Sequence, residues 1–412
     1  PARRPPGAAP RLPHQAVPGI AELWRHTLGD PSVIVGIYES PPDLSHPCLA
    51  DADLEARTPW WSPAGPVDDR LREHGTFTAS VVFGRPGTVL PGLAPHCRGV
   101  IIGDTRPEHP DLPPDPWHTA RAVEELLDAG AHIIQFNISH HTASADTDEM
   151  LKRAIARAVD AGVLVTAAAG NDYGACVVAP ALLPGVLVVG AHRADGAISS
   201  YSNYGPAYAG HGITALGEAV LGATPGDGGV KARKGTCTAV ALVTGAAALL
   251  VSMQRHLGRR ADPLAVRDAL LATARPCTAE QAHGNPARCL NGYLDLPAAT
   301  AHLFPDLTTP PPPEAVLPTP AAAFPSPPRP GTSEHGRHPA TPATAFVVRP
   351  LRRPERSPDQ IEATEKADGP YQGPQEASRA ADLRARTLVT RPHRPLAAPA
   401  GSLAADPFAG GS

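Results

Sequence analysis

A small-residue turn followed by a long apolar run is the feature that most constrains the fold of this chain. Residues 234–239 read Lys-Gly-Thr-Cys-Thr-Ala, and residues 240–253 are mostly Ala, Leu and Val without a charged side chain. We expect this run to form a helix of the protein core, because it is shorter than the roughly 20 apolar residues that a membrane-spanning helix needs. The turn then places Cys237 in the first turn of a buried helix.

Cys237 is a candidate nucleophile because of this position. The N-terminus of a helix carries a partial positive charge, which favours a thiolate over a thiol. Arg233 and Lys234 add positive charge just upstream in the sequence. The alternative is an inert side chain, since free cysteine is among the most buried residue types. The turn at Gly235 and Thr236 favours the nucleophile, which also needs a base.

His74 is the candidate base. It lies in the segment 73–84, Glu-His-Gly-Thr-Phe-Thr-Ala-Ser-Val-Val-Phe-Gly, in which small residues follow the histidine along one face of an expected helix. Such a face packs closely against a neighbouring element, and this holds the imidazole still. A single histidine on a helix is usually structural, but the spacing of the small residues here favours general acid–base catalysis.

Glu39 is the candidate that orients the imidazole. Residues 33–38, Val-Ile-Val-Gly-Ile-Tyr, form a continuous apolar run that is typical of a buried parallel strand, and Glu39 follows it directly. A carboxylate at the end of a core strand is well placed to hold a histidine in its catalytic orientation. The alternative is an acid in a solvated loop.

Asn171 completes the set of candidate catalytic residues. Residues 163–169 form a second buried strand, which Gly170 and Asn171 close. The amide group of an asparagine at such a place can donate a hydrogen bond to an oxyanion, as in the best-known serine peptidases. As a turn residue Asn171 would need no such role, but the preceding small residues favour the catalytic interpretation.

The order Glu39, His74, Cys237 is also the chain order of acid, base and nucleophile in subtilisin. The chain resembles the subtilases, and in particular the cyanobactin-maturation proteases, which cut or macrocyclise ribosomal precursor peptides. The resemblance runs from about Val17 to Leu303. It includes residues 18–24, 28–31, 43–48, 92–99, 179–184, 201–205 and 217–223. It implies a subtilisin-like three-layer α/β fold with a mostly parallel central sheet, a peptide substrate and no organic cofactor.

The chain departs from the pattern of the resembled family in four places. Cys237 replaces its serine, Glu39 replaces its aspartate, and Ala241 replaces a proline four residues after the nucleophile. The strand that pairs with the substrate reads Ser-His-His at residues 139–141 instead of Ser-Gly-Gly. Glycine there lets a substrate backbone come close, so we expect the two imidazoles to narrow or reshape the cleft.

The resemblance also implies a surface that contacts the substrate. We expect it to include Ser139, His140, Ala168, Ala169 and Gly170. The alternative at His140 and His141 is a metal site, which we do not favour because adjacent residues on a strand point to opposite faces. We therefore expect neither a metal nor another cofactor.

The changes in the triad are consistent with a thiol enzyme. Cysteine keeps a strong nucleophile, and a Cys–His pair depends less on its third member, which is Asn in papain-like enzymes. Ala241 frees the start of the helix to shift and to fit the larger sulfur. The sequence thus predicts a peptidase, or a peptide acyl transferase that ligates or macrocyclises, acting on a ribosomal precursor peptide. The alternative is an inactive pseudoprotease that binds a peptide or a partner protein.

The rest of the chain predicts the order of its elements. Residues 117–128 and 146–160 are expected to form helices, each followed by an apolar strand, at 132–136 and 163–169. Such alternation of helices and strands predicts a parallel sheet that is covered by helices on both faces.

Composition divides the chain into three parts. We expect a flexible N-terminus over residues 1–16, a subtilisin-like peptidase domain over 17–304 and a disordered tail over 305–412, which is rich in Pro, Ala and Arg. The tail holds a small basic cluster at 349–356. We interpret this cluster as a solvated patch and expect no nucleic-acid partner, because the net charge is −4 and no aromatic residues are interleaved with the arginines.

The sequence also suggests where the protein works. Residues 1–13 are basic and proline-rich without the apolar core of a signal peptide. Six cysteines in a chain of this size do not make a secreted disulfide scaffold. We therefore expect a cytoplasmic protein that has no contact with a membrane. Cys277 and Cys289 either close a local loop or remain reduced.

Overall fold

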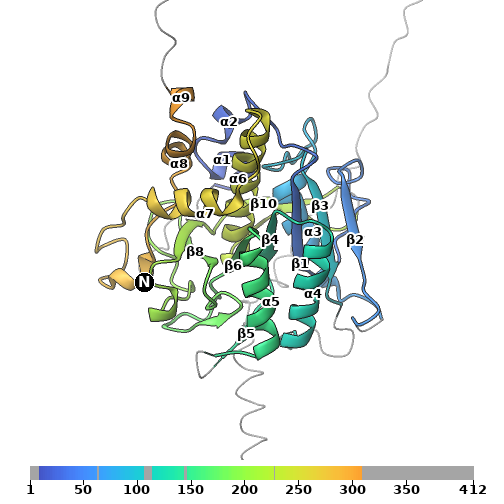
Figure 1. The fold of residues 1–412 in the computed structure, drawn as a ribbon, viewed down its shortest axis with the longest axis horizontal. Helices are drawn as coiled ribbons and strands as arrows, with labels where there is room; N and C mark the ends of the chain where they lie inside the picture. The colour runs from blue at the N-terminus through green and yellow to red at the C-terminus, as the bar shows by residue number, and fades with distance from the viewer. Residues whose placement is uncertain (1–8, 63–64, 106–113, 143–145, 227, 309–412) are drawn as a thin grey trace, which may run out of the picture. The chain divides into compact units, whose positions relative to one another are not determined.

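A seven-stranded sheet forms the centre of the computed structural model, which describes residues 9–62, 65–105, 114–142, 146–226 and 228–308 (Figure 1). Neighbouring strands of this sheet are all parallel. Their order is β2 (Leu54–Arg57), β3 (Arg98–Gly103), β1 (Ile34–Glu39), β4 (Ile133–Phe136), β6 (Leu164–Ala168), β8 (Val186–His192) and β9 (Gly212–Leu216). The central strands are apolar and buried, as the continuous apolar runs predicted.

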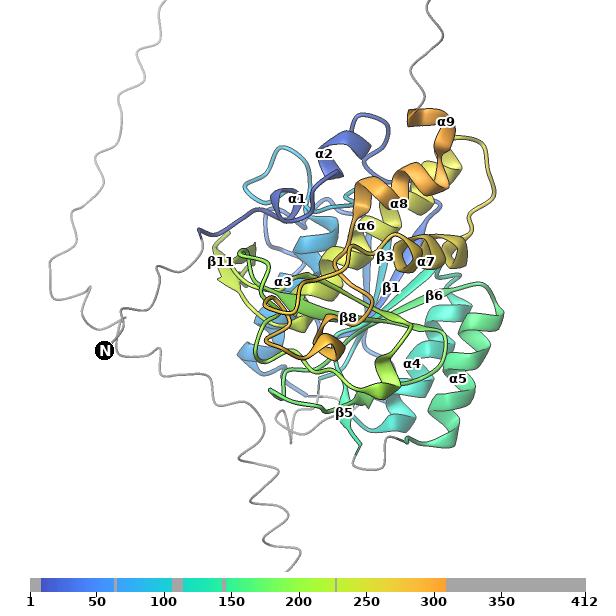
Figure 2. The same ribbon diagram turned by 90° about the vertical axis from the view of Figure 1, so that its left-hand side faces the viewer.

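Helices cover both faces of the sheet and give three layers (Figure 2). One face carries α3 (Asp69–Phe83), α6 (Thr236–His256) and α7 (Pro263–Ala272). The other face carries α4 (Pro116–Asp128) and α5 (Glu149–Asp160). The predicted subtilisin-like α/β architecture is therefore confirmed.

The remaining described elements are short. They are α1 (Pro13–Ala16), α2 (Ile20–Leu23), η1 (Pro206–Tyr208), η2 (Pro286–Cys289), α8 (Leu296–Leu303) and α9 (Pro305–Thr308), with the antiparallel pairs β5 (His140–His141) and β7 (Val178–Ala179), and β10 (Val220–Ala223) and β11 (Val230–Arg233).

The apolar run at residues 240–253 lies within α6, the central helix of one layer. The helix has 21 residues, so it is longer than the apolar run alone and, by length and composition, long enough to cross a membrane. However, 94% of its apolar window is buried inside the protein. It packs against α3 and four strands of the sheet, and Gly245 allows the side chain of Leu93 to lie where a Cβ atom would be. The expectation of a core helix is confirmed, although its length was underestimated.

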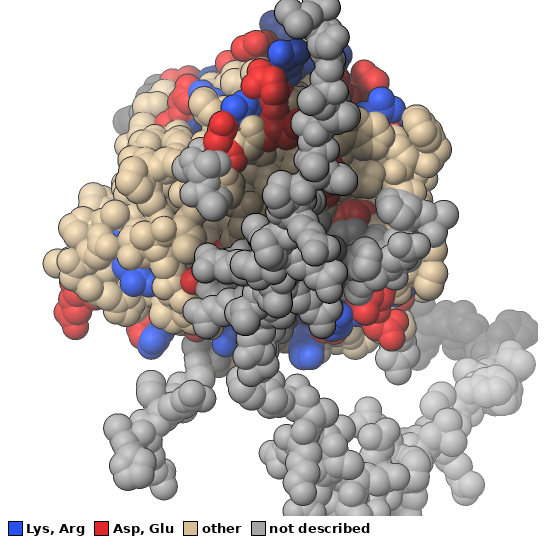
Figure 3. All heavy atoms as spheres, turned by 90° about the horizontal axis from the view of Figure 1, so that it is seen from below, with Lys and Arg blue, Asp and Glu red and all other residues tan. Residues whose placement is uncertain are grey.

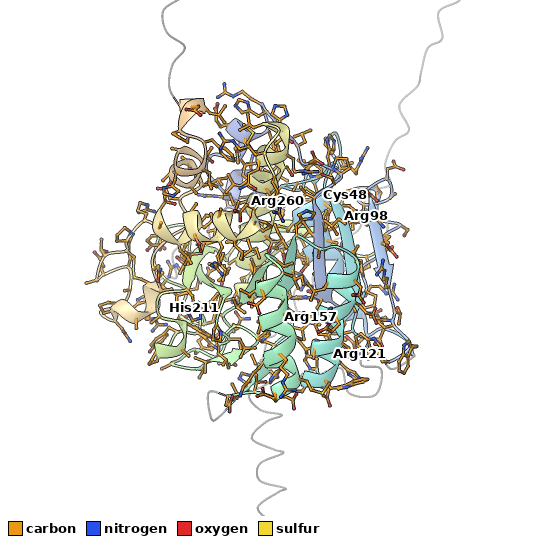
Figure 4. All side chains as sticks on the ribbon, in the orientation of Figure 1. Cys48, Arg98, Arg121, Arg157, His211 and Arg260 are labelled. Atoms are coloured by element: carbon orange, nitrogen blue, oxygen red, sulfur yellow. A yellow bond between two sulfur atoms is a disulfide. The ribbon has the colours of Figure 1, made fainter. Side chains whose placement is uncertain are left out.

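The two helices on the opposite face pack against each other. An ion pair between Arg157 of α5 and Glu124 of α4 links them, and Figure 4 labels Arg157 at this place. Helix α4 follows the prediction closely. Helix α5 begins at Glu149 instead of Asp146, because the carboxylate of Asp148 accepts a hydrogen bond from the Met150 N–H and so caps the helix there.

The folded domain begins earlier than expected. The backbone of Arg11 bonds to Ala219 and Leu221 at 2.8 Å each, and Ala16 is buried. Residues 11–16 are thus part of the domain, which corrects the expected flexible segment over 1–16. At the other end, Pro305–Thr308 forms α9, so the predicted tail begins with a helical turn. Residues 309–412, including the basic cluster, lie outside the described residues.

The cysteines outside the candidate site are of three kinds. Cys277 and Cys289 form a disulfide, which decides between the two alternatives left open by their spacing. Cys48 and Cys97 are free and buried, and burial raises the pKa of their thiols to about 12 and about 11. Cys176 is free and half-buried.

Candidate active site

The four candidate catalytic residues come from four different elements, and the carboxyl ends of the parallel strands point downward in Figure 1. Glu39 is the last residue of β1, and Asn171 follows β6. His74 lies in the second turn of α3, and Cys237 is the second residue of α6. The fold thus brings the acid, the base and the nucleophile together from distant parts of the sequence.

Glu39 orients His74 directly. The Nδ1 atom of His74 lies 2.8 Å from Oε2 of Glu39, and the other carboxylate oxygen accepts the Ser40 N–H at 2.7 Å. Glu39 is 1% exposed, so the alternative of a solvated loop acid is wrong. Burial raises the pKa of this carboxyl, but the charge of His74 and the hydrogen bonds to the carboxylate outweigh it and leave the pKa below its usual value.

Sequence reasoning missed two residues that hold the carboxylate. Asn137, which follows β4, donates from Nδ2 to Glu39 at 2.7 Å and to Thr78 Oγ1 at 2.8 Å. Thr78, one turn after His74 on α3, donates to the same carboxylate oxygen at 3.3 Å. Gln135 in turn donates to the Asn137 side-chain oxygen at 3.0 Å. A polar Gln135 inside an otherwise apolar strand was the signal that could have revealed this network.

His74 and Cys237 stabilise each other's charged form. Burial lowers the pKa of His74, but the carboxylate of Glu39 and the charge and hydrogen bond of Cys237 raise it well above its usual value. Burial raises the pKa of Cys237, but the charge and hydrogen bond of His74 bring it below the usual thiol value. These mutual effects favour a thiolate–imidazolium pair over the neutral pair.

The Cys237 thiol and the Asn171 amide both lie near Gly235. A Cβ atom built at Gly235 would lie 2.8 Å from the Cys237 sulfur and 3.8 Å from Asn171 Nδ2. Gly235 has a φ of 146°, a conformation that side chains rarely adopt. The Asn171 oxygen accepts the Thr236 N–H at 2.9 Å and so orients the amide. The Asn171 N–H₂ group can donate a hydrogen bond to an oxyanion.

An ion pair connects the helix of the base with the strand that leads to the nucleophile. Arg233 of β11 lies 2.5 Å from the carboxylate of Glu73, the residue before His74, and its guanidinium lies over the Phe77 ring. Lys231 also approaches Glu73, at 3.7 Å. Arg233 lowers the pKa of Cys237 further, after the larger contribution of His74. The positive charge of Arg233, which precedes Cys237 in the sequence, therefore also acts on Cys237 in the folded protein.

The predicted substrate-pairing strand is β5, which pairs with β7 in an antiparallel ladder. The two imidazoles point to different environments. His140 is buried, and its Nε2 lies 2.8 Å from Thr147 Oγ1. His141 is about half exposed, and its Nε2 lies 3.3 Å from Asp172 Oδ1. Ser139 is half-buried beside them. In the described part of the chain, no group of three candidate metal ligands gathers.

The second part of the expected substrate surface needs correction. Ala169 is fully buried, its N–H bonds to Val189, and its carbonyl accepts the hydroxyl of Tyr208 at 2.9 Å. Gly170 is buried too, and its N–H and carbonyl bond to Thr236 and Asn203. These two residues support the Asn171 loop from within and offer no free backbone group to a substrate. Ala168 lies at the end of β6 and is 5% exposed.

The described surface that is visible at the lower end of the molecule carries charges of both signs. Figure 3 views it from below and shows Lys and Arg side chains together with Asp and Glu side chains around the described part of the face.

A family model described as "Subtilase family" matches residues 30–293, which contain all four candidate catalytic residues. This chain belongs to the subtilase family. The match covers more than half of the 412 residues, and it confirms the family that the motifs indicated. The chain therefore has the subtilisin-like fold of a family that includes peptidases.

Curated relatives are described as subtilisin-like proteases. "Subtilisin-like protease 1" of Trichophyton rubrum is 32% identical over 210 residues, which are 49% of this chain and 39% of that protein. "Subtilisin-like protease 1" of Arthroderma gypseum is 29% identical over 245 residues, 58% of this chain and 47% of that protein. The chain thus spans less than half the length of these two relatives.

Solved structures connect the chain to one branch of the family. The prenylagaramide maturation protease PagA is 38% identical, with a TM-score of 0.64 over 70% of this chain and 99% of that chain. The PatG macrocyclase in complex with peptide is 31% identical, with a TM-score of 0.66 over 70% and 96%. A protease and a macrocyclase of cyanobactin maturation are therefore both close structural neighbours, as the resemblance implied.

Proposed function

We propose that this chain is a peptidase or peptide acyl transferase with a Cys237–His74–Glu39 triad. The observation that carries the proposal is the position of His74. Its imidazole lies 2.8 Å from the Glu39 carboxylate, and it interacts with Cys237 through charge and through a hydrogen bond. Such a nucleophile, base and orienting acid are the parts that covalent catalysis at a carbonyl requires.

The mechanism follows from these contacts. The Cys237 sulfur attacks the carbonyl carbon of a peptide, and the Asn171 amide donates to the oxygen that becomes negative. His74 gives its proton to the leaving amine, the C–N bond breaks, and a thioester on Cys237 remains. An incoming amine or water molecule then attacks the thioester and loses its proton to His74, and the sulfur leaves. Amine attack forms a peptide bond, whereas water yields an acid.

We further propose that the substrate is a ribosomal precursor peptide and that amines compete well with water for the thioester. The similarity to PagA, a maturation protease, and to PatG, a macrocyclase solved with a peptide, supports this substrate class. Thioesters react with amines in preference to water more strongly than oxygen esters do. Cys237 therefore favours ligation or macrocyclisation over hydrolysis. We place this reaction in the cytoplasm, where precursor peptides are made.

The test is an activated peptide ester supplied with and without a competing amine, with products read by mass spectrometry. We expect a thioester on Cys237 and mainly amide product at high amine, and no acyl-enzyme in Cys237→Ala. Cys237→Ser and Ala241→Pro should each move the product ratio towards acid. Acid as the sole product at high amine would rule out the transferase. A chain that binds the peptide but never forms the acyl-enzyme would be the pseudoprotease.

A further inference from the structure

The turn that carries the nucleophile is bonded to the end of β9, where a buried tyrosine joins the contact. Tyr201 is 6% exposed, and its hydroxyl donates to the carbonyl of Gly217 at 2.7 Å. The same carbonyl accepts the N–H of Gly235 at 2.8 Å. One carbonyl oxygen therefore binds both the Tyr201 hydroxyl and the backbone two residues before Cys237. The proposed mechanism does not use this tyrosine.

The Tyr201 hydroxyl also interacts with the nucleophile turn itself. Burial raises the pKa of this phenol, and the charges of Glu218 and Cys237 add to the increase. Hydrogen bonds to Ser199 and to the Gly235 backbone oppose it without cancelling it. The phenol therefore stays protonated near neutral pH and acts as a hydrogen-bond donor.

Gly217 lacks a side chain at the point where these groups meet. A Cβ atom built there would lie 3.1 Å from both the Tyr201 hydroxyl and the Gly235 carbonyl oxygen. It would also lie 2.4 Å from the Cβ atom of Ala191. The N–H of Gly217 donates to the His192 carbonyl at 2.9 Å, so the acceptor carbonyl is anchored to β8 of the central sheet. The contact is thus closely packed and rests on a rigid element.

The backbone at Gly235 depends on such support. Gly235 is the N-cap residue of α6, and it has no side chain that caps the helix. Because glycine adopts many backbone conformations, its φ of 146° is fixed only by its neighbours. Cys237 lies in the first turn of α6, so a rotation at Gly235 would move the sulfur relative to the His74 imidazole. The Asn171 oxygen holds the Thr236 N–H at 2.9 Å and is a second support of this turn.

We propose that Tyr201 is a positioning residue, which fixes the Gly235 turn through the Gly217 carbonyl and so keeps the Cys237 sulfur in its interaction with His74. The effect on acylation rests on the proposed function, but the interaction of sulfur and imidazole can be measured without a substrate. Loss of the hydroxyl should slow thioester formation and leave peptide binding unchanged, because it moves the nucleophile and removes no contact to the peptide.

The experiment removes the hydroxyl alone. Alkylation of Cys237 by iodoacetamide is measured against pH by mass spectrometry in the full-length wild type and in Tyr201→Phe, with folding checked by circular dichroism. His74, Glu39 and Arg233, whose charges act on the thiol, are the same in both proteins. We expect the pH midpoint of alkylation to rise by about half a unit, because a displaced sulfur loses part of its interaction with His74.

Acylation is measured in the same two proteins with an activated peptide ester under single-turnover conditions. The maximal rate of thioester formation should fall about tenfold in Tyr201→Phe, and the half-saturating peptide concentration should not change. The loss is moderate because Asn171 still supports the turn. Phenylalanine fills the same space as tyrosine, so we expect the variant to fold.

Tyr293→Phe is the matched control. Tyr293 is also buried, and its hydroxyl also donates to a glycine carbonyl, that of Gly196. Urea denaturation should show a similar loss of stability in both variants, but the alkylation midpoint should shift in Tyr201→Phe alone. Equal shifts in the two variants, or an unchanged midpoint in folded Tyr201→Phe, would overturn the proposal. A shift in Tyr201→Phe alone, together with no acylation in the wild type, would support the positioning role and reject the proposed function.

Discussion

The two sides of the candidate active site are held in place in different ways. On one side, Glu39 is buried at the end of a core strand and is bonded to His74, Ser40, Asn137 and Thr78. On the other side, a two-residue strand carries His141, which is half exposed and contacts Asp172 at 3.3 Å. The first side is fixed by several buried contacts, and the second depends on few contacts near water.

This difference indicates which property each side controls. Buried hydrogen bonds to a charged group fix its position and its pKa, and they are costly to lose. An exposed ion pair contributes little to stability, about 0–1 kcal/mol, and can open for a ligand. We therefore expect substitutions on the Glu39 side to lower the reactivity of Cys237, whereas loss of the exposed ion pair on the His141 side should change it little. The following predictions test the Glu39 side of this comparison.

The largest effect should come from His74→Ala. Because His74 lowers the pKa of Cys237, the wild-type thiol should be alkylated at a pH below the usual thiol pKa of about 8.5. Removing His74 should move this pH dependence upward and reduce alkylation and acylation near neutral pH by about 10²–10⁴-fold. Mass spectrometry measures alkylation of Cys237 against pH.

Cys176 provides the control within the same chain. It is also free and half-buried, but burial and the charge of Asp172 raise its pKa. It should react slowly in both the wild type and His74→Ala. If Cys237 reacts no faster than Cys176 in the wild type, the Glu39 side does not activate the thiol and the separation between the two sides fails.

Gly235→Ala should have the next largest effect. The new methyl group would lie 2.8 Å from the Cys237 sulfur in a backbone conformation that alanine avoids. Displacing the sulfur should reduce acylation about 100-fold, measured as the rate of thioester formation. Gly258→Ala is the matched control, since Gly258 also has a positive φ, of 70°, but nothing lies within 4 Å of its Cβ position. Equal losses of acylation rate in the two variants would show that backbone strain alone, and not displacement of the sulfur, lowers the rate.

Glu39→Ala should have a smaller effect than His74→Ala, because a thiolate depends less on the third member of a triad. We expect acylation to fall about 10–100-fold and to remain measurable, and Glu39→Asp to change it less. Asn137→Ala should lower the free energy of unfolding by about 1–3 kcal/mol, because a partner of a buried carboxylate is lost. Urea denaturation measures the free energy of unfolding of Asn137→Ala, and the rate of thioester formation measures acylation in the Glu39 variants. A complete loss of acylation in Glu39→Ala would show that the acid is as essential as in a serine triad.

The smallest effect is expected for Arg233→Ala. Arg233 lowers the pKa of Cys237 less than His74 does, and its ion pair with Glu73 is partly exposed. The pH dependence of alkylation should shift slightly upward, with a change in rate of less than about fivefold. Lys231→Ala, which removes the more exposed partner of Glu73, is the comparison and should change alkylation less still. A large loss in Arg233→Ala would mean that the β11 contact positions the nucleophile.

Local patterns were sufficient to predict much of this molecule. Glu39 at the end of an apolar strand, His74 in a helix of small residues, and Cys237 before an apolar run were each visible in a few adjacent residues, and the fold brings all three together. The layered α/β architecture followed from the same signals, because buried parallel strands and amphipathic helices have distinct periods in the sequence.

Contacts between distant residues could not be predicted in this way. The polar Gln135 indicates a polar network at the end of β4, but it does not show that Asn137 bonds to Glu39, 98 positions away. The burial of Ala169, the pairing of Arg11 with the segment at 219–221 and the ion pair between His141 and Asp172 also arise only when separate elements pack together. The sequence by itself therefore determined the types of element and the reactive side chains at their ends. The tertiary structure decided which groups are buried and paired, because burial and hydrogen bonding depend on neighbours that only packing supplies.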